Sequence, residues 1–512
     1  MRVVLAVSIS PLALVLATCA DARPAADPPR AATITVALDT QVAEIDPRFV
    51  SFAVDTAQLV GGTFWSPSAE VEVGTGRHRV APYDFSRPRL RVLAAALAPA
   101  YLRIGGSDAD KTFYDLSDMP RAEPPEGYAW VLTRAEWDGM HDFVDALGLE
   151  LVFTLGAGPG PRLHDGRWDE SNARTLLTYA RDAGHAIALL ELGNEPNAFS
   201  LIHGLGFSRT GREHASDLRA MRALAHELLP DARIGGPASA YWPLLGEPAA
   251  VGPDVMAEAG DALDAVSWHY YPMQSRRCPI ATRRATLASA LSVETLTELD
   301  TWADEVGALR DAHAPAAELW LGESGPAQCG GEPGLGQSFA GTFGWLDQLG
   351  RLARRGYHAV VRQTLSGSDY GLVDDETLEP RPDYWASLLF RRLMGTRVLA
   401  ATSDEDGVLA YAHCAREGAG DVVVLLLNPG DTPGDVTLSG DITSTASHTL
   451  WLATASAPEA SEVRIDGAPL RLEEGAERMP EIEGAVLEHA PLRLPPTSWA
   501  FVRVRADAAA CR

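Results

Sequence analysis

The stretch Leu189-Leu-Glu-Leu-Gly-Asn-Glu-Pro-Asn197 indicates both a scaffold and a chemistry. Its apolar first half predicts a buried strand, and Pro196 predicts that this strand ends at Asn194 and Glu195. A carboxyl group at the end of a buried strand is partly removed from water, which raises its pKa and suits it to donate a proton. The alternative role for Glu195 is an ion pair that only fixes the strand end. A catalytic role requires a second carboxylate.

The same alternation of strand and helix repeats on both sides of this stretch. Strands that alternate with helices favour a parallel sheet, and eight of them fit a closed barrel. We therefore expect an α/β fold with a (β/α)8 TIM barrel over residues 46–396. The eight apolar segments, each followed by a segment of helical length, are residues 49–55, 101–106, 149–155, 187–193, 233–236, 265–271, 318–323 and 358–364.

The pattern changes near residue 397. Short alternating strands separated by Gly, Pro, Asp and Ser follow, as in residues 420–428 and 499–504, and they predict a β-sandwich. One further alternating strand precedes the barrel. We expect residues 31–45 plus 397–512 to form a C-terminal β-sandwich domain that takes an N-terminal strand.

The first 22 residues combine one basic residue, an apolar run and small residues. They predict a signal peptide over residues 1–22, and therefore a secreted, periplasmic or cell-surface protein. Leu16-Ala-Thr-Cys19 is close to a bacterial lipoprotein box, so one expectation is membrane attachment through a lipidated Cys19. Simple cleavage near Ala20 or Ala22 is the alternative.

Charge and composition exclude several classes of function. The 512-residue chain has a formal charge of −26, which repels polyanions, so we expect no nucleic-acid partner. Lys111 is the only lysine among 43 basic residues, which leaves one candidate for any Schiff-base or P-loop chemistry. The length and loop-rich composition describe a globular protein, and we expect a monomer.

Four cysteines remain after the signal peptide: Cys278, Cys329, Cys414 and Cys511. An exported protein can form disulfides, and spacing alone leaves three pairings open. The sequence has no Cys-x-x-Cys motif and no His-x-x-x-His cluster. We therefore expect no metal site and no cofactor.

The second carboxylate is Glu323, at the end of the seventh predicted strand. Glu195 ends the fourth, and catalytic groups of such barrels lie at the carboxyl ends of the strands. Both carboxylates should therefore face one cleft. Two carboxylates across a sugar-sized cleft are what glycoside hydrolysis needs.

Six stretches around these positions carry a resemblance to a known family. They are Leu97-Ala-Pro-Ala-Tyr-Leu-Arg-Ile-Gly-Gly106, Glu191-Leu-Gly-Asn-Glu-Pro-Asn197, Trp268-His-Tyr-Tyr271, Trp320-Leu-Gly-Glu323, Val361-Arg-Gln363 and Pro382-Asp-Tyr-Trp-Ala-Ser-Leu-Leu-Phe390. These stretches resemble the heparanase-like hydrolases of glycoside hydrolase family 79, which cleave β-glucuronides by a retaining mechanism. The likeness covers most of the chain from about Asp46 and implies a Cys414–Cys511 disulfide, leaving Cys278 with Cys329 as a second bridge.

The resemblance implies a role for each matching residue. Glu195 is expected to be the acid/base, Glu323 the nucleophile, and Asn194 a donor to the sugar 2-hydroxyl. Tyr271 is expected to donate to the nucleophile, although a tyrosine satisfied elsewhere in the core is the alternative. The remaining expected sugar contacts are Asp55, Gln363, Tyr370, the backbone of Gly330, Ser107 and Arg276.

The sequence also departs from the family. The loops at 156–160 and 237–243 are neutral where relatives that degrade heparan sulfate carry basic residues, and Arg162, Arg276 and Arg277 are the main exceptions. The Arg276-Arg277 pair is expected either to hold a uronate or to be solvated loop charge. Gln328 stands where exo-acting relatives place a tyrosine, which puts carboxylate recognition in question.

The expected activity is that of a retaining β-glucuronidase-like glycoside hydrolase acting on β-linked uronic-acid glycosides, with a carbohydrate substrate as its partner. A related barrel glycosidase acting on an arabinoside or xyloside is the first alternative. A non-catalytic carbohydrate-binding surface protein is the second.

Overall fold

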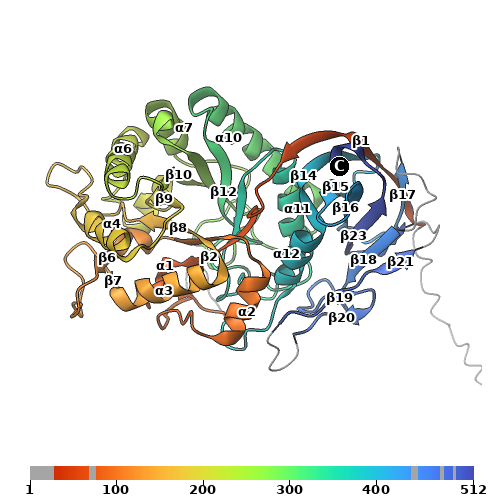
Figure 1. Cartoon of the computed structure of the whole chain (residues 1–512), viewed down its shortest axis with the longest axis horizontal. Coiled ribbons are helices and arrows are strands. Elements are labelled where there is room, and N and C mark those ends of the chain that lie inside the picture. Colours follow the sequence, from red (N-terminus) through yellow and green to blue (C-terminus); the bar gives the residue numbers. More distant parts are fainter. Residues whose placement is uncertain (1–27, 68–75, 440–447, 473–477, 488–491) are drawn as a thin grey trace, which may run out of the picture.

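The computed structural model describes residues 28–67, 76–439, 448–472, 478–487 and 492–512. It contains a closed barrel and a second, antiparallel-rich sheet that lie side by side (Figure 1). The predicted signal peptide over residues 1–22, with Cys19, lies outside the described residues.

The barrel is built from the eight predicted strands, so the expected (β/α)8 architecture is confirmed. The strands pair in parallel in the closed order β10-β11-β12-β13-β2-β5-β8-β9. Their bounds are β2 (Val50–Asp55), β5 (Tyr101–Gly105), β8 (Glu150–Leu155), β9 (Leu189–Leu192), β10 (Arg233–Tyr241), β11 (Ala265–Tyr270), β12 (Glu318–Ser324) and β13 (Ala359–Arg362).

Strand β10 runs five residues beyond the predicted end at Gly236. Pro237 would normally end a strand, because proline lacks a backbone donor. Instead, the register with β11 shifts between Pro237 and Ser239, and this bulge accommodates the proline while pairing continues. The extension contacts the segment that carries Glu195: the carbonyl of Ala238 accepts a hydrogen bond from the backbone amide of Glu195 at 3.0 Å.

Helices surround the barrel and follow its strands. Helix α3 shows why they begin and end where they do: Thr133 and Glu136 form a capping box, and Gly148 ends the helix in the left-handed conformation. The helices are α1 (Thr56–Leu59), α2 (Pro88–Ala96), α3 (Arg134–Leu147), α4 (Ser171–Ala183), α5 (Phe199–Ile202), α6 (Gly211–Leu228), α7 (Val251–Ala259), α8 (Leu287–Ala290), α9 (Val293–Thr297), α10 (Leu299–His313), α11 (Gly341–Ala353) and α12 (Pro382–Leu393).

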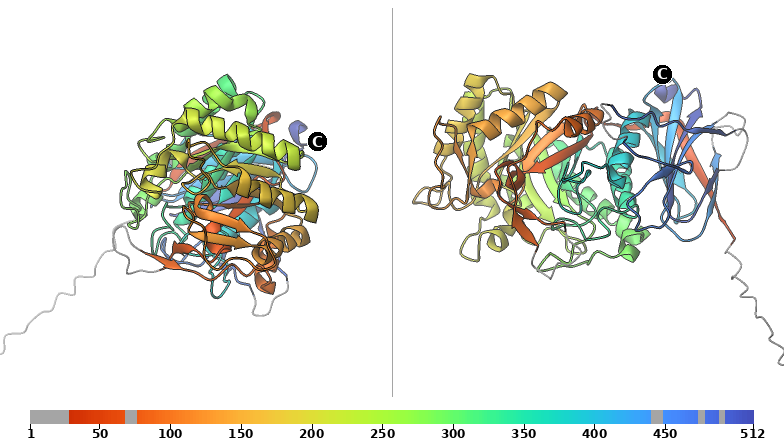
Figure 2. Two further views of the ribbon diagram at one scale, coloured as in Figure 1. Left: turned by 90° about the vertical axis from the view of Figure 1, so that its left-hand side faces the viewer. Right: turned by 90° about the horizontal axis from the view of Figure 1, so that it is seen from below.

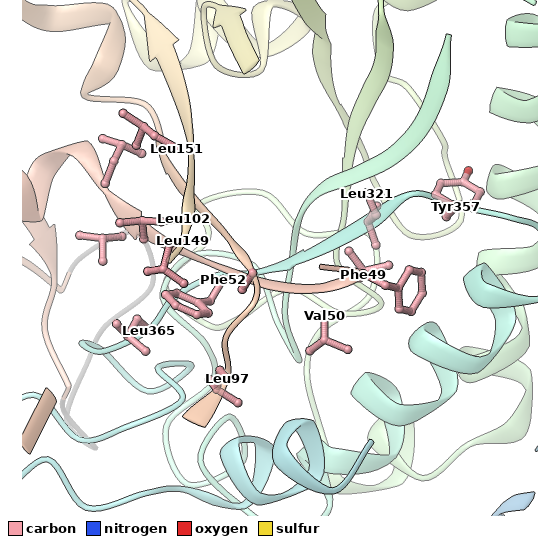
Figure 3. Close-up of a cluster of buried hydrophobic side chains, with 14 of the residues drawn as sticks. Phe49, Val50, Phe52, Leu97, Leu102, Leu149, Leu151, Leu321, Tyr357 and Leu365 are labelled. Atoms are coloured by element: carbon pink, nitrogen blue, oxygen red, sulfur yellow. The ribbon is translucent and has the colours of Figure 1, made fainter. Parts of the chain in front are cut away.

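Large apolar side chains fill the space between strands and helices. Phe49, Phe52, Leu97 and Leu102 lie in one such cluster (Figure 3).

Two short strand pairs are added to the loops that follow β2 and β5. They are β3 (Thr63–Trp65) with β4 (Arg77–Arg79), and β6 (Thr112–Asp115) with β7 (Trp130–Thr133).

Within the described residues, the second sheet has eleven strands and surrounds its own hydrophobic core. Its N-terminal strand β1 (Arg30–Glu44) lies between β14 and β17, antiparallel to the former and parallel to the latter. Figure 1 shows this strand crossing from the barrel along the sheet. The other strands are β14 (Met394–Ser403), β15 (Leu409–Ala415), β16 (Asp421–Asn428), β17 (Gly434–Ser439), β18 (His448–Thr454), β19 (Arg464–Ile465), β20 (Ala468–Pro469), β21 (Ala485–Leu487), β22 (Leu492–Leu494) and β23 (Ser498–Arg505).

Helices α11 and α12 lie between the barrel and the second sheet (Figure 2). Strand β16 is buried on both faces: Val424 belongs to the core of the sheet, whereas Leu425 belongs to the core shared with the barrel. The indole of Trp499 donates to the hydroxyl of Thr342, in α11, at 2.9 Å. Apolar packing with a buried hydrogen bond across this junction favours a fixed arrangement of the two parts.

Two disulfides are present, Cys278–Cys329 and Cys414–Cys511. The first joins the loops that follow β11 and β12, and the second ties the chain end to β15. Bonds of this kind persist in oxidising compartments. Within the part of the chain that the structure describes, we find no helix with the length and apolarity needed to cross a membrane.

Candidate active site

A cavity of about 630 Å³ opens at the carboxyl ends of the barrel strands. Most of the residues expected from the sequence line it, each placed by the end of a strand or the loop that follows. These are Asp55 at the end of β2, Ser107 after β5, Asn194 and Glu195 after β9, Tyr271 after β11, Glu323 within β12, and Gln363 and Tyr370 after β13.

The two candidate catalytic carboxylates meet across this cavity. Glu195 and Glu323 are each 8% exposed, and an oxygen of one lies within 4.8 Å of an oxygen of the other. Retaining glycosidases hold their two carboxyl groups about 5–5.5 Å apart, whereas inverting ones need about 6.5–9.5 Å for an intervening water. An oxygen–oxygen approach within 4.8 Å is nearer to the first range than to the second.

Glu195 lies in a turn that aims its side chain into the cavity. Its backbone is left-handed, with φ 54° and ψ 58°, a conformation that costs a non-glycine residue about 1 kcal/mol or more. Burial raises the pKa of Glu195 to about 7, although Arg103 acts in the opposite direction. This carboxyl group is therefore largely protonated in mildly acidic solution.

Glu323 has a different environment, because both of its oxygens accept hydrogen bonds. Arg103 Nη1 donates to Oε2 at 2.9 Å, and the Tyr271 hydroxyl donates to Oε1 at 2.9 Å. Burial raises the pKa of Tyr271 well above its usual value, so the hydroxyl keeps the proton that it donates. Both contacts hold the Glu323 carboxylate in a fixed orientation.

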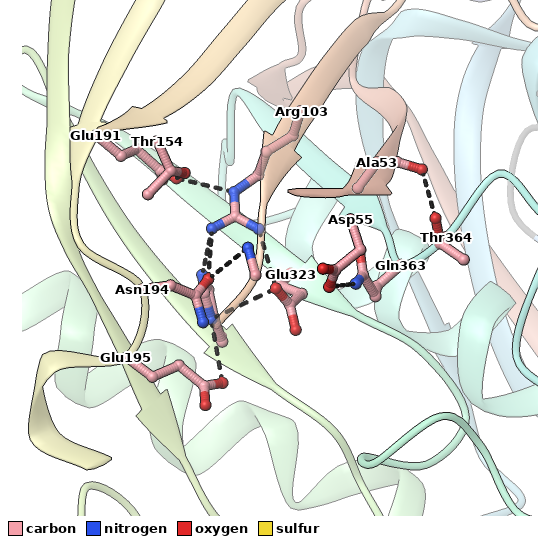
Figure 4. Close-up of polar contacts among 12 residues, drawn as sticks. Ala53, Asp55, Arg103, Thr154, Glu191, Asn194, Glu195, Glu323, Gln363 and Thr364 are labelled. Atoms are coloured by element: carbon pink, nitrogen blue, oxygen red, sulfur yellow. Dashed lines mark hydrogen bonds and ion pairs between the residues drawn. The ribbon is translucent and has the colours of Figure 1, made fainter. Parts of the chain in front are cut away.

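Arg103, at the centre of the site, was not identified from the sequence. It lies in β5 and is 1% exposed. Its Nε donates to Glu191 at 2.8 Å and its Nη2 to Asn194 Oδ1 at 3.1 Å (Figure 4). The signal that could have revealed it is the charge itself: Arg103 and Glu191 interrupt two otherwise apolar strands, and buried charges are normally paired.

Glu191 anchors this arginine from below the cavity. Its carboxylate also accepts from Ser267 Oγ at 2.7 Å and Thr154 Oγ1 at 3.0 Å. Burial alone would raise the pKa of Glu191, but Arg103 and the hydrogen bond from Ser267 hold it below the usual range. Glu191 is therefore an ionised support for Arg103.

Two glycines after Arg103 make the close packing possible. A Cβ at Gly105 would lie 2.6 Å from the guanidinium carbon of Arg103, and one at Gly106 would lie 2.2 Å from Asp55 Oδ2. Gly106 also has φ +95°, which favours glycine. The backbone amide of Gly106 donates to Asn194 Oδ1 at 3.0 Å. The side-chain Nδ2 of Asn194 therefore remains to donate into the cavity.

His269 bridges the two carboxylates. Burial lowers the pKa of His269 to about 4, so the ring is neutral near pH 7. Its Nε2 lies 3.3 Å from Arg103 Nη2 and must accept, so Nδ1 carries the hydrogen and donates to Glu195 Oε1 at 3.2 Å. This orientation follows from the arginine, which has only donors.

Glu195, His269 and Glu323 also have the spacing of a metal-binding group, with ligand atoms within 4.8 Å of one another. The donor set does not suit a cation, however, because Arg103 already donates to Glu323 and to His269. A second positive charge beside this guanidinium would be repelled.

Asp55 and Gln363 are joined on the far side of Glu323. Gln363 Nε2 donates to Asp55 Oδ2 at 2.9 Å, and the amide of Ala57 donates to Oδ1 at 2.9 Å. Burial, with smaller contributions from Asp108 and Glu323, raises the pKa of Asp55 to about 7. Tyr370 completes this polar side of the cavity.

Two expected contact residues do not line the cavity. Arg276 lies outside the lining, and its Nε donates to Glu332 Oε1. The Gly330 carbonyl accepts from Ser368 Oγ at 2.7 Å and from the amide of Asp369 at 3.0 Å, inside the loop. A contact between Arg276 and a uronate stays a prediction, and in this arrangement the charge of Arg276 is matched by Glu332.

Two other arginines do line the cavity. Arg277 is 0% exposed and donates to the carbonyls of Ser66 and Gly331 as well as to Asp369. Arg77, in β4, is exposed, and its guanidinium lies 4.1 Å from the centre of the Trp65 ring. Arg77 was not identified from the sequence, because it lies outside the barrel strands on which the search for site residues depended.

An eight-stranded barrel with two buried carboxylates facing a sugar-sized cavity defines a glycoside hydrolase of the barrel class. The family model "Glycosyl hydrolase family 79, N-terminal domain" matches residues 31–350. The chain belongs to this family and is heparanase-like.

Individual proteins agree with this assignment. Heparanase from Gallus gallus is 30% identical over 548 aligned residues, covering 95% of this chain and 98% of that protein. A Homo sapiens relative named "Inactive heparanase-2" is 28% identical over 408 residues, covering 75% and 66%. A solved 4-O-α-L-rhamnosyl-β-D-glucuronidase from Fusarium oxysporum 12S has a TM-score of 0.66 at 16% identity, covering 92% and 99%, and shows a likeness of fold.

Proposed function

We propose that this protein is a retaining β-glucuronidase-like hydrolase that cleaves β-linked uronic-acid glycosides by double displacement. The observation that carries the proposal is the pair Glu195 and Glu323, whose oxygens approach within 4.8 Å while their environments differ. One carboxyl group has a pKa raised to about 7, and the other accepts from a guanidinium and a tyrosine. Such a divergence separates an acid from a nucleophile.

In the first step, Glu323 attacks the anomeric carbon while the protonated Glu195 donates its hydrogen to the departing glycosidic oxygen. A covalent glycosyl–Glu323 ester forms and the aglycone leaves as a neutral alcohol. In the second step, ionised Glu195 takes a proton from water, and the resulting hydroxide attacks the anomeric carbon. The sugar departs with retained configuration, Glu323 is ionised again, and Glu195 is protonated again.

The neighbouring residues assist at defined atoms. Asn194 Oδ1 is occupied by Arg103 and by the amide of Gly106, so its Nδ2 is oriented to donate to the sugar 2-hydroxyl, a contact that strengthens in the transition state. Tyr271 and Arg103 orient Glu323 for attack. Asp55, Gln363 and Tyr370 are the candidate contacts to the hydroxyls of the terminal sugar.

The uronate specificity is assigned to Arg77. Arg276 and Arg277 are matched by Glu332 and Asp369, whereas Arg77 lines the polar side of the cavity and acts electrostatically on Asp55 and Tyr370. A guanidinium is a good partner for a sugar carboxylate because it can donate two parallel hydrogen bonds.

Hydrolysis of a panel of 4-nitrophenyl glycosides tests the proposal. The expected result is the highest kcat/KM on the β-glucuronide, with the β-xyloside and α-arabinofuranoside at least tenfold lower, and loss of all turnover in Glu323→Gln. Preference for a pentoside would overturn the uronide assignment and leave the mechanism intact. A wild-type protein that turns over no member of the panel would favour the non-catalytic alternative.

We also propose that the protein is exported, either released or anchored through Cys19. The two disulfides and the apolar N-terminal run support this proposal. Fractionation of a bacterial expression host is the test. If the wild-type protein is membrane-bound and the Cys19→Ser variant is released, lipidation is favoured. If both proteins are exported in soluble form, simple cleavage is favoured.

A further inference from the structure

The cavity has two chemically different sides. The polar side lies over β13, β2 and β5 and carries Gln363, Asp55 and Ser107, together with the rings of Phe64 and Trp65 from the loop after β2. The opposite side lies over the adjacent strands β9, β10 and β11. Its lining includes an apolar set formed by Ala198, Leu201, Ile202, Trp242, Pro279 and Ile280.

The position of the proton donor determines which part of a substrate meets which side. Glu195 must reach the glycosidic oxygen, so the sugar lies on one side of its carboxyl group and the leaving group on the other. The sugar side is that of Asp55 and Gln363, which adjoin Glu323. The leaving group therefore faces the segment that directly follows Glu195, namely η2 (Pro196–Ala198) and α5.

Apolar side chains are also exposed around this side. Leu201 is 57% exposed and Ile280 is 53% exposed, although both line the cavity. Of the nine large apolar side chains exposed in the described ranges, five come from the loops after β9, β10 and β11. Exposed apolar residues that gather at one place, rather than singly, mark a binding surface.

The turn after Trp242 extends the same surface. Leu244 and Leu245 are 61% and 53% exposed, and the amides of Leu245 and Gly246 donate to the carbonyl of Trp242 at 3.2 and 2.9 Å. Leu244 has φ 64°, which is rare for a non-glycine residue. The turn therefore holds two leucines in solvent beside a tryptophan that lines the cavity.

Charge on this side does not favour an anionic leaving group. Its cavity-lining cation, Arg277, is fully buried and donates to Asp369 and to two carbonyls. The chain as a whole has a formal charge of −26, which disfavours approach of a sulfated polymer.

From these observations we infer that the leaving-group side recognises an apolar aglycone, an alkyl or aryl group, instead of a sulfated sugar. This inference rests on the proposed glycosidase function and names its substrate class. The substrates are β-glycosides whose aglycone packs on Leu201, Ile280 and the indole of Trp242, and burial of its apolar surface supplies the binding energy.

Methyl and octyl β-glucuronides provide the test, because their leaving groups have nearly the same acidity and differ in apolar length. With about 0.8 kcal/mol for each fully buried methylene and only partial burial, we expect kcat/KM to be roughly 10- to 100-fold higher for the octyl glycoside. In the double variant Leu201→Ser/Ile280→Ser, this ratio should fall at least fivefold. The ratio is independent of the fraction of folded protein.

Val486→Ser is the matched control, since Val486 is 66% exposed on β21 of the second sheet, and it should keep the wild-type ratio. An octyl-to-methyl ratio near one, an unchanged ratio in the double variant, or faster cleavage of a glucuronide linked to a sulfated glucosamine would each overturn the inference. If only xylosides are cleaved, the uronide assignment fails while the ratio for octyl and methyl xylosides still tests the apolar side. If no glycoside is cleaved, both proposals fail.

Discussion

Two clusters of charge differ in what surrounds their carboxyl groups. Around Arg103, the carboxylates of Glu191 and Glu323 share one guanidinium, and Glu195 accepts from the neutral His269. Around Arg351, in α11, three guanidiniums meet the buried Asp347, the half-buried Asp300 and the exposed Asp304.

The comparison shows that buried charge alone does not mark a catalytic site. In the Arg351 cluster, Asp347 accepts from Arg351 at 2.7 Å and also from Tyr411, across the junction with the second sheet. The charged groups of this cluster therefore stabilise the junction between the barrel and the second sheet. In the Arg103 cluster, Glu195 faces a cavity, and burial raises its pKa to about 7 although Arg103 acts in the opposite direction. Burial raises the pKa of Asp347 as well, so the feature that distinguishes the Arg103 cluster is its access to the cavity.

The largest expected effect is on activity, in Glu323→Gln. Removing the nucleophile should lower kcat on 4-nitrophenyl β-glucuronide by on the order of 10⁴-fold or more, and the melting temperature should change little. Asp347→Asn is the control in the other cluster: it should lower the melting temperature and leave kcat per folded molecule within about twofold. Equal losses of activity in the two variants would remove the distinction between the clusters.

Replacing each central arginine by methionine should separate the clusters next. Arg103→Met leaves Glu191 and Glu323 without their guanidinium, and Arg351→Met does the same to Asp347. Each loss of a buried pair should cost about 3–5 kcal/mol of unfolding free energy. Only Arg103→Met should also lower kcat, by roughly 10²- to 10³-fold, because it removes a donor that orients the nucleophile. Urea unfolding and steady-state kinetics on the folded fraction measure the two effects. An Arg103→Met variant that keeps the wild-type kcat would contradict the account.

The pH dependence should report Glu195. Its carboxyl group is protonated below pH 7 and ionised above, so kcat/KM should be flat at pH 5–6 and fall about tenfold for each pH unit well above 7. Asp55 also has a pKa raised to about 7, so Asp55→Asn is the necessary control. The alkaline fall should persist in Asp55→Asn and disappear in Glu195→Gln. The reverse pattern would assign the proton donor to Asp55.

The smallest expected effect concerns Arg77 and its neighbour Arg79. Arg77 lines the cavity, whereas Arg79 lies 5.2 Å from the Trp130 ring centre and outside the lining. Loss of a charge-assisted hydrogen bond should raise KM for the glucuronide about tenfold in Arg77→Gln, with less than a twofold change for the xyloside. Arg79→Gln should behave as the wild type. A similar KM increase for both sugars would show that Arg77 does not recognise the carboxylate.

Much of the scaffold could be predicted because the eight barrel strands are continuous apolar segments with regular spacing. Glu195 and Glu323 lie at the ends of such segments, so their shared face followed from topology. The full length of β10 could not be predicted, because Pro237 would normally end a strand and only a bulge between neighbouring strands allows it to continue.

Side-chain direction in the loops was the part that sequence could not provide. Arg276 and Arg277 are adjacent, yet one pairs with Glu332 outside the cavity and the other is fully buried against Asp369. A single residue of offset in a turn reverses the direction of a side chain, and the turn is fixed by contacts distant in sequence. Arg103 was missed for a related reason: a charge inside an apolar strand acquires meaning only when its partners on other strands are known.

Covalent trapping tests the central claim most directly. Incubation with a 2-deoxy-2-fluoro-β-glucuronide carrying a good leaving group, followed by mass spectrometry of the peptides, identifies the residue that attacks the sugar. The account predicts one adduct on the peptide that contains Glu323, formed in the wild type and absent in Glu323→Gln. An adduct on Glu195, on Asp55 or on no residue of a catalytically active protein would contradict it.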